Sequence, residues 1–219
     1  MVIFYKIVMS VYKFFLYSVL AKAWNVFSIN GNGVKIKKGY KLRGFIYFDC
    51  HKTAHVTIGK GFVANSGFFY NNIGRQQATS IIAKKGSTIR IGSNVGMSSC
   101  TLVSLKKISI GNNVRIGGNV VIYDSDFHSL DVKERTSIPE IKMNIRSKEV
   151  TIEDNVFIGS HVTILKGSHI GENSIVGACS VISGDVPPNE IWVGNPAKFI
   201  KKLKGNFDYA EAVIMNANY

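Results

Sequence analysis

The chain is poor in proline, cysteine and charge, and each shortage excludes a class of protein. Proline occurs only 4 times against 21 glycines, so tight turns are favoured over rigid linkers. Charged residues make up 19% and hydrophobic residues 46%, which excludes a disordered polypeptide. The cysteines, Cys50, Cys100 and Cys179, are odd in number and widely spaced. They fit neither a zinc nor a disulfide framework, and a reducing cytoplasm is the simpler interpretation.

Acidic residues are scarce as well. Against 27 lysines and arginines stand 14 acidic residues, which gives a formal net charge of +13. Nucleic acid is the first partner that such a charge indicates, but no basic helix, RNA-binding signature or zinc finger is present. A polyanionic small ligand or an anionic membrane surface would use the same charge. Much of this charge lies in residues 35–44 and 198–205. We therefore expect no nucleic-acid partner.

The chain also lacks an uninterrupted apolar run at its N-terminus. Residues 1–27 are apolar and aromatic, but Lys6, Lys13 and Lys22 interrupt them. A bilayer span needs about 20 apolar residues, and a central lysine costs about 3 kcal/mol. The small residues at 21–23 would fit a signal-peptide cleavage site, although Lys13 lies inside the apolar region. The pattern predicts an amphipathic helix that either packs on the protein or a neighbouring subunit, or lies in the membrane interface.

What the sequence does contain is a six-residue repeat. From residue 152 the first position of every hexad is aliphatic, and the fifth is always Val or Ser. The first positions are Ile152, Ile158, Ile164, Ile170, Val176 and Ile182. The same phase returns upstream between Ile91 and Ile122 with a slip of one residue, and a fainter copy lies at 56–63. A period of six is neither helical nor the alternation of a single strand.

Such a period suits a short strand followed by a corner. The first residue of each hexad points inward, and the small fifth residue fills the bend. Three strands close one triangular coil, and successive coils stack at about 4.8 Å. The recurrent glycine in second position tolerates backbone angles that other residues resist. A sandwich of ordinary strands would show alternation of period two with hairpin turns, and the sequence has neither.

Residues 123–149 cannot follow the hexads. The segment is rich in charge and contains Pro139, so the chain must leave the coil and return, as a long functional loop does. Asp124, Asp126 and His128 stand at its base. In an arbitrary protein this run would be a solvated loop entrance. Here a rigid wall precedes it, which favours a well-defined His128 with one face open to a ligand.

The stretch "NVFIGSHVTILKGSHIGENSIVGACSVISGDVPPNEIWVGNPAKFIKKL" resembles the C-terminal half of bacterial sugar O-acetyltransferases. These belong to the hexapeptide-repeat acyltransferases, and the strongest resemblance is to enzymes that acetylate capsular or lipopolysaccharide sugars. The resemblance implies an all-β solenoid, a left-handed parallel β-helix that works as a homotrimer. The expected divisions are an N-terminal helix and irregular lead-in at 1–55, the β-helix at 56–205 with a protruding loop at 123–149, and a short tail at 206–219.

The resemblance also implies the catalytic base. Histidine suits the removal of a proton from a sugar hydroxyl because an imidazole titrates near neutral pH, and such a base supplies about 10²–10⁴ in rate. His128 takes that role by resemblance, with direct transfer and no acyl-enzyme. Asp126 and Asp124 either orient the ring or bind acceptor hydroxyls. The β-helical carbonic anhydrases hold zinc with three histidines, but that spacing is absent here, so no metal is expected.

Acetyl-CoA is the co-substrate that the resemblance implies, in a groove along the C-terminal coils between subunits. The matching positions are Phe157, Gly159, Ser160, Gly177, Ala178, Pro196, Ala197 and Lys198. Lys198 would meet a phosphate, and Phe157 replaces a tryptophan that is frequent in relatives. Cys179 occupies an ordinary coil position with no base predicted beside it, which argues against an acyl-cysteine route.

Together these expectations describe a cytoplasmic acetyl-CoA-dependent O-acetyltransferase acting on a sugar hydroxyl of a bacterial surface polysaccharide or its precursor. Peripheral contact with the inner membrane face through the N-terminus is the second hypothesis. Two alternatives remain open: an N-acetyltransferase acting on a nucleotide-linked amino sugar, and a non-catalytic β-helix that serves as a binding scaffold. The acceptor sugar and its hydroxyl are not encoded in any motif.

Overall fold

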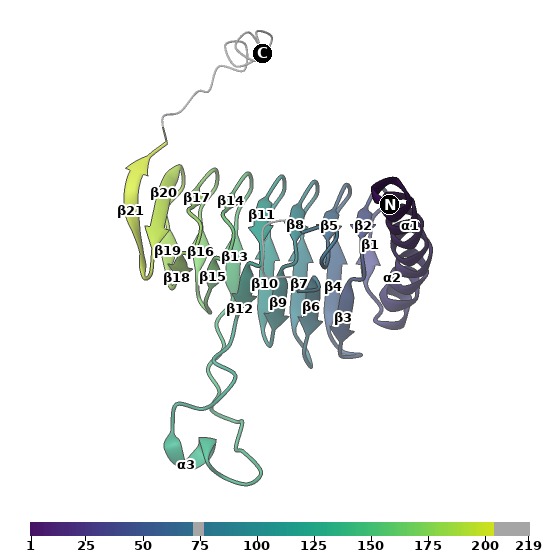
Figure 1. Ribbon diagram of the computed structural model, residues 1–219. Coiled ribbons are helices and arrows are strands. Elements are labelled where there is room, and N and C mark those ends of the chain that lie inside the picture. The colour runs from purple at the N-terminus through teal and green to yellow at the C-terminus, as the bar shows by residue number, and fades with distance from the viewer. Residues whose placement is uncertain (72–76, 204–219) are drawn as a thin grey trace.

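The computed structural model describes residues 1–71 and 77–203, and the tail predicted at 206–219 lies outside them. The chain forms a left-handed parallel β-helix in which three sheets make the sides of a column. Figure 1 shows a helix at the N-terminal end of the column and an arm that projects from its lower edge. The predicted fold class is confirmed.

The strands of each sheet are stacked in the order of the coils. Sheet A contains β1 (Lys35–Ile36), β4 (His55–Ile58), β7 (Thr88–Ile91), β10 (Lys107–Ile110), β13 (Val150–Ile152), β16 (His169–Ile170) and β19 (Asp185–Val186). Sheet B contains β2 (Lys41–Arg43), β5 (Val63–Asn65), β8 (Gly96–Ser98), β11 (Arg115–Gly118), β14 (Phe157–Ile158), β17 (Ile175–Val176), β20 (Glu190–Gly194) and β21 (Ala197–Lys202). Sheet C contains β3 (Tyr47–Cys50), β6 (Ser80–Ala83), β9 (Thr101–Ser104), β12 (Val121–Tyr123), β15 (Thr163–Ile164) and β18 (Val181–Ile182).

The hexads form the core of the column. Ile152 pairs with Ile170 and Ile164 with Ile182, so one coil takes 18 residues in this part of the chain. These side chains are at most 2% exposed, and each stacks on its equivalent in the next coil. The fifth positions are buried too, for example Val156 at 1%. The interior is therefore a continuous file of aliphatic side chains, whose burial from water stabilises every coil on its neighbours.

Asparagines make the turn from sheet A to sheet B. Five of them adopt left-handed backbone angles, with φ between 57° and 62°: Asn94, Asn113, Asn155, Asn173 and Asn189. Each of the first four donates its side-chain amide to the side-chain oxygen of the next, at 3.0–3.2 Å. Asparagine tolerates this region better than other residues with a side chain. The corner is thus fixed by a ladder of amide hydrogen bonds.

The second-position glycines have a different purpose from the predicted one. None of them has a positive φ, so the expectation of unusual backbone angles is wrong. Close stacking requires them instead: a Cβ added to Gly159 would lie 2.5 Å from the backbone nitrogen of Ala178 in the next coil. At Gly117 it would lie 2.6 Å from the nitrogen of Ser160. Glycine here allows two backbones to approach each other.

The first coil begins earlier than residue 56. β1 pairs with β4 through Ile36 and Ile58, and β3 pairs with β6, so residues 35–50 already wind as a coil. Ile36, Leu42 and Phe48 carry the same six-residue spacing, but the abundant lysines around them and the partly exposed Leu42 weaken the pattern. The predicted lead-in at 1–55 therefore contains a helix and one complete coil.

A continuous helix covers the open end of the column. It consists of α1 (Val2–Lys13), a π-helical turn η1 (Phe14–Leu20) and α2 (Ala21–Gly31). Asn25 donates to the Gly44 carbonyl and accepts from the Ile46 N–H, both at 2.9 Å. These bonds satisfy backbone groups that no earlier coil can pair. By length and composition alone, the helix Val2–Gly31 could also cross a bilayer.

Candidate functional site

The arm leaves the column through a two-stranded neck. β12 ends at Tyr123 and β13 begins at Val150, so residues 124–149 lie between them, where the sequence predicts a loop at 123–149. Ser125 and Ser147 form an antiparallel bridge, and Asp126 N donates to the Arg146 carbonyl at 3.1 Å. At the return, Lys107 bonds Glu149 at 3.0 Å and lowers the pKa of that carboxyl. The base of the arm is therefore fixed to the column.

Asp124 belongs to the column rather than to the site. Its carboxylate is fully buried and accepts three hydrogen bonds, from Ser104 Oγ at 2.6 Å, Leu105 N at 2.7 Å and Lys106 N at 2.8 Å. All three donors lie at the turn between β9 and β10, one coil earlier. With its oxygens engaged there, Asp124 neither contacts the imidazole nor faces an acceptor, and the expectation of either role does not agree with this geometry.

Asp126 lies at the neck with one oxygen engaged and one free. Oδ1 forms an ion pair of 2.6 Å with Lys166, which comes from the corresponding turn of the next coil. Oδ2 is buried and has no hydrogen-bond partner among the described residues. A buried carboxylate oxygen without a donor is costly, which makes it a natural acceptor for a ligand hydroxyl. Among the described residues, the structure shows no hydrogen bond between the Asp126 side chain and the His128 ring.

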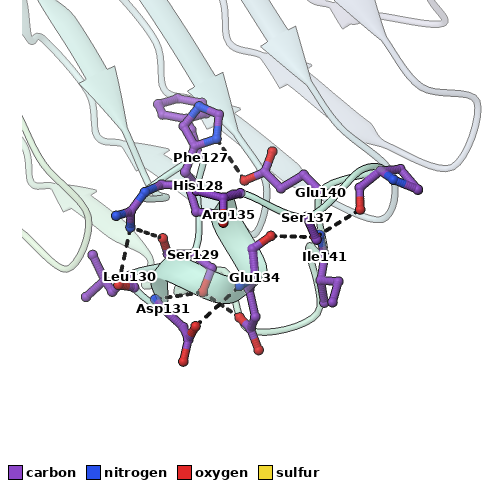
Figure 2. A network of polar contacts seen from close by, with 12 residues as sticks. Phe127, His128, Ser129, Leu130, Asp131, Glu134, Arg135, Ser137, Glu140 and Ile141 are labelled. Carbon is purple, nitrogen blue, oxygen red and sulfur yellow. Dashed lines mark hydrogen bonds and ion pairs between the residues drawn. The ribbon is translucent and has the colours of Figure 1, made fainter.

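His128 pairs with a residue that the sequence did not indicate. Its Nδ1 lies 2.9 Å from Glu140 Oε1, on the opposite limb of the arm (Figure 2). The His128 side chain is 65% exposed, whereas that of Glu140 is only 19% exposed. An ionised carboxylate only accepts hydrogen bonds, so in the neutral ring this contact assigns the hydrogen to Nδ1 and the lone pair to Nε2. Glu140, and not an aspartate, therefore contacts the imidazole.

Glu134 holds the two limbs of the arm together. It lies in the short helix α3 (Val132–Arg135), whose first turn is capped by Asp131. Its carboxylate accepts hydrogen bonds from Ser129 Oγ and Asn144 Nδ2, and Arg135 reaches back to the Ser129 carbonyl at 2.8 Å. Figure 2 shows this network directly beside His128 and Glu140. Polar contacts within the arm thus join Ser129, the residue after His128, to α3 and to Asn144 on the returning limb.

The turn before His128 is conformationally unusual. Phe127 has a φ of 65°, which is rare for an aromatic residue, and its ring rests edge-on against Tyr123 at 5.2 Å between centroids. Left-handed backbone costs about 1–2 kcal/mol for a residue with a side chain. Outliers of this kind are concentrated at functional sites.

The residues expected to hold the donor lie together along another edge of the column, where sheet B turns into sheet C. Gly159 stacks on Ala178, and the Cys179 N–H donates to the Ser160 carbonyl at 2.9 Å. The hairpin of β20 and β21 closes over the same edge: a Cβ on Gly177 would lie 2.6 Å from the side chain of Val193. Residues assembled at this edge are Gly159, Ser160, Gly177, Ala178, Pro196, Ala197 and Lys198.

The exposure of these residues fits a surface groove rather than a cavity. Ala178, Pro196 and Lys198 are exposed, and Ser160 is partly exposed. Phe157 stands apart, since it lies at the start of β14 on the outer face of sheet B and is 49% exposed. Among residues 1–71 and 77–203, no group of three or more histidine, cysteine or acidic side chains is placed to hold a metal ion.

The imidazole and the donor residues occupy different edges of one chain. The neck leaves where sheet C turns into sheet A, and Lys166 fixes it there. The donor edge around Ser160 lies on the other side of sheet C. Ser160 and Lys166 are six residues apart, a length of chain that spans at most about 20 Å. Within the described residues of one chain, the arm and this edge therefore lie at different corners of the column.

Comparisons with known proteins agree with this architecture. Residues 149–184 match the family model described as bacterial transferase hexapeptide (six repeats). WbbJ of Escherichia coli K12, a protein whose name assigns it to O-acetyl transfer in lipopolysaccharide biosynthesis, is 30% identical over 169 residues, covering 74% of this chain and 81% of WbbJ. On this similarity the chain belongs to the family of hexapeptide-repeat transferases.

Other relatives match a smaller share of this chain. Galactoside O-acetyltransferase of Escherichia coli K12 is 37% identical over 121 residues, covering 54% of this chain and 56% of that protein. A Schizosaccharomyces pombe protein named as an acetyltransferase is 44% identical over 105 residues, 48% of each chain. The chain thus spans about half the length of these curated relatives.

Solved structures show the same fold. The polysialic-acid-specific acetyltransferase NeuO superposes with a TM-score of 0.61 at 24% identity, covering 84% of this chain and 82% of that one. A hexapeptide-repeat acetyltransferase of Vibrio cholerae, crystallised with acetyl coenzyme A, gives a TM-score of 0.52 at 26% identity, covering 88% of this chain and 83% of that one.

Proposed function

We propose that the protein is an acetyl-CoA-dependent O-acetyltransferase that modifies a sugar hydroxyl of a bacterial surface polysaccharide or its precursor. The observation that carries the proposal is the His128–Glu140 pair, an exposed imidazole held through Nδ1 at 2.9 Å. Membership of the hexapeptide-repeat transferases supports acyl transfer, and the names of the similar proteins support an oxygen acceptor on a sugar. The Vibrio relative with bound acetyl coenzyme A supports the choice of donor.

The chemistry assigned to His128 is general base catalysis. Nε2 accepts the proton of the acceptor hydroxyl as its oxygen attacks the thioester carbonyl of acetyl-CoA. The new C–O bond forms, the C–S bond breaks, and the departing CoA sulfur takes up the proton. Glu140 accepts the Nδ1 hydrogen throughout, which fixes the tautomer and stabilises the imidazolium between the two proton transfers.

Acceptor binding is assigned to the neck of the arm. The unpaired Oδ2 of Asp126 is buried two residues before His128, while Lys166 secures Oδ1. A hydroxyl that donates to Oδ2 would satisfy this oxygen and bring the sugar to the base of the arm. Discrimination by such a site is strong, because an acceptor without the hydroxyl leaves a buried carboxylate oxygen unsatisfied.

The complete site is assigned to a homotrimer. Because the donor edge and the arm lie on opposite sides of sheet C, donor and base can meet only if one copy supplies the edge and another supplies the arm. The arm also carries apolar side chains that no residue in the described part of the chain covers: Leu130 is 65% exposed, Met143 90% and Ile138 99%. Burial of these side chains against a neighbouring copy would stabilise the association.

The proposed location of the protein in the cell follows from where its two substrates would be found. Acetyl-CoA is supplied in the cytoplasm, and a glycan precursor on a lipid carrier would be met at the inner membrane face. Peripheral contact of the N-terminal helix with that face is therefore part of the proposal. Contact with a membrane is independent of the transfer chemistry, so each is tested separately.

The decisive experiment is a paired acceptor assay. Release of free CoA from acetyl-CoA would be followed with a panel of hydroxyl sugars and with the matched amino sugars, some of them nucleotide-linked. The proposal expects turnover with hydroxyl sugars and an O-acetyl ester that mild base removes. Turnover with amino sugars alone would establish N-acetylation instead. Absence of acetyl-CoA binding by calorimetry would leave a non-catalytic scaffold.

A further inference from the structure

A cavity of about 360 Å³ lies between α2 and the first coil. Three cationic side chains, Lys22, Lys41 and Arg43, line it, together with the aromatic rings of Tyr40 and Tyr70. None of the lining residues is acidic. Within the described residues, the side chains of Lys22, Lys41 and Arg43 form no ion pair and no hydrogen bond. The cavity therefore concentrates positive charge that the protein itself does not neutralise.

A phosphate group fits this arrangement. Arginine presents a planar set of donors that matches phosphate oxygens, and lysine adds a mobile point charge. Three like charges around one cavity repel each other when it is empty, and an anion relieves that repulsion. Phosphate is thus the chemical class that the lining indicates.

The helix beside the cavity presents its apolar side chains outward. The buried residues of α2 are small, polar or aliphatic: Ala21, Asn25, Ser28 and Ile29. On the other side Phe27 is 70% exposed. Helices of globular proteins normally turn their apolar stripe towards the core. This orientation indicates that the outer face of α2 lies against another apolar phase.

The outward-facing apolar surface of α2 continues along α1. Almost every described side chain of α1 is exposed, including Ile3 at 76%, Phe4 at 72% and Val11 at 63%. Lys6 and Ser10 are four residues apart and lie on one face, which gives the helix a narrow polar stripe. Basic amphipathic helices with aromatic residues lie in the plane of the membrane interface. A continuous apolar surface of this extent marks an interaction site.

Charge selects the kind of membrane. The chain carries a net charge of +13, and Lys35, Lys37 and Lys38 of the first coil are exposed near α2. Anionic lipids attract such residues with about 1 kcal/mol for each basic side chain near the surface. Lys22 and Val26 belong to α2 and line the cavity, so it opens along the flank of the helix. Phosphates lie at that depth when the outer face of α2 enters the acyl boundary.

We propose that the helix 2–31 lies in the interface of an anionic membrane and that the cavity between α2 and the first coil binds the phosphate of a phospholipid headgroup. The proposal rests on the membrane contact included in the proposed function, and not on the transfer chemistry. It adds a phosphate site with named ligands, Lys22, Lys41 and Arg43.

Vesicle flotation tests the proposal. Full-length protein would be mixed with phosphatidylglycerol–phosphatidylcholine vesicles or with pure phosphatidylcholine vesicles at fixed ionic strength. We expect wild type to float with the anionic vesicles, and the Lys41→Ala/Arg43→Ala variant to partition roughly 10- to 30-fold more weakly. The control, Lys52→Ala/Lys85→Ala, removes the same charge from exposed positions outside the cavity and should lose less than about threefold through screened long-range attraction.

Three outcomes would overturn the proposal. If the wild-type protein does not float with the vesicles, it does not bind the membrane. If it binds inorganic phosphate in calorimetry but does not float, the cavity binds a soluble ligand. If the two double variants lose the same amount of vesicle binding, the cavity is not a phosphate site, since net charge alone would then explain the binding. Acetyl transfer to a soluble sugar should be unchanged in Lys41→Ala/Arg43→Ala, so failure of the transferase proposal is recognised independently.

A second variant distinguishes the membrane from another copy of the chain. Phe4→Ser/Phe15→Ser lowers the apolarity of the outer helix face and leaves the cavity intact; both side chains are more than half exposed. We expect it to weaken flotation at least tenfold and to leave the oligomer unchanged in sedimentation velocity. Dissociation of the oligomer with undiminished flotation would assign the face to subunit contact and overturn the proposal.

Discussion

The β-helix and the arm differ in where they keep their apolar side chains. In the β-helix, Ile164 and Ile170 are completely buried, whereas in the arm Ile138 and Met143 are at least 90% exposed. The arm relies on polar contacts such as those of Glu134. A buried file of aliphatic residues provides stability, and a polar network orders a segment in solvent. The comparison indicates that the column carries the apolar core, whereas the imidazole proposed as the base lies on a segment ordered by polar contacts.

The largest effect is expected from a substitution in the arm, and it is an effect on catalysis. His128→Ala should lower kcat by about 10²–10⁴, because it removes the base. The midpoint of thermal unfolding should stay within about 1 °C of wild type, since the side chain is 65% exposed and lies outside the core. Steady-state kinetics and calorimetry measure the two quantities.

The column offers a matched histidine for this test. His169 is also exposed and also pairs with a carboxylate, Glu153, at 2.8 Å, but it lies in β16. His169→Ala should therefore keep kcat within about twofold of wild type. Near-normal turnover in His128→Ala, or an equal loss in both variants, would contradict the assignment of the base.

The next largest effect is on stability and comes from the column. Ile164→Ala should lower the free energy of unfolding by about 2–5 kcal/mol, because it opens a cavity in a file of fully buried side chains. Ile138→Ala, at the 99% exposed tip of the arm, should change it by less than about 0.5 kcal/mol in the monomer. Urea denaturation would show whether the contrast holds, and a loss of similar size in both variants would refute it.

The two regions also differ in how far sequence predicts them. The coils repeat one local pattern, and each hexad places its own aliphatic residue inward, so the register of Ile152, Ile158 and Ile164 follows directly. The close approach of Gly159 to Ala178 follows as well, because stacked coils bring equivalent residues together, whereas the assignment of these residues to the donor comes from the resemblance alone. The first coil was missed because lysines surround its hexads and its second inward residue, Leu42, stacks on the small Ala64.

The arm has no period from which to predict its contacts. The sequence places Asp124, Asp126 and His128 together at the base of the arm. The chain turns at Phe127, however, where φ is 65°, and Asp124 faces the preceding coil. The partner of the imidazole, Glu140, is twelve residues further on and reaches it only through the folded path of the arm. Contacts set by such a path leave no local signal.

A smaller catalytic effect is expected at Glu140. Glu140→Gln keeps the shape of the side chain but removes the charge that favours the imidazolium, so kcat should fall on the order of tenfold, a part of what the base supplies. Glu153→Gln is the matched change in the column, where His169 and the Glu172 N–H lower the pKa of the carboxyl. That variant should retain wild-type kcat. A Glu140→Gln enzyme with unchanged kcat would leave Glu140 with a structural role only.

The smallest effect concerns the corners that hold the column rigid. Asn155 combines a φ of 61° with hydrogen bonds from Asn113 and to Asn173. Asn155→Ala loses both advantages and should cost about 1–2 kcal/mol of unfolding free energy, whereas Asn155→Gly keeps the backbone angle and should cost about 0.5–1 kcal/mol. The difference between the two variants in urea denaturation measures the backbone contribution, and the remaining loss in Asn155→Gly is an upper limit for the ladder, because glycine also adds conformational freedom to the unfolded chain. A glycine variant more stable than wild type would show that the ladder contributes nothing. In both variants kcat should stay constant, because the arm is attached at a different corner of the column.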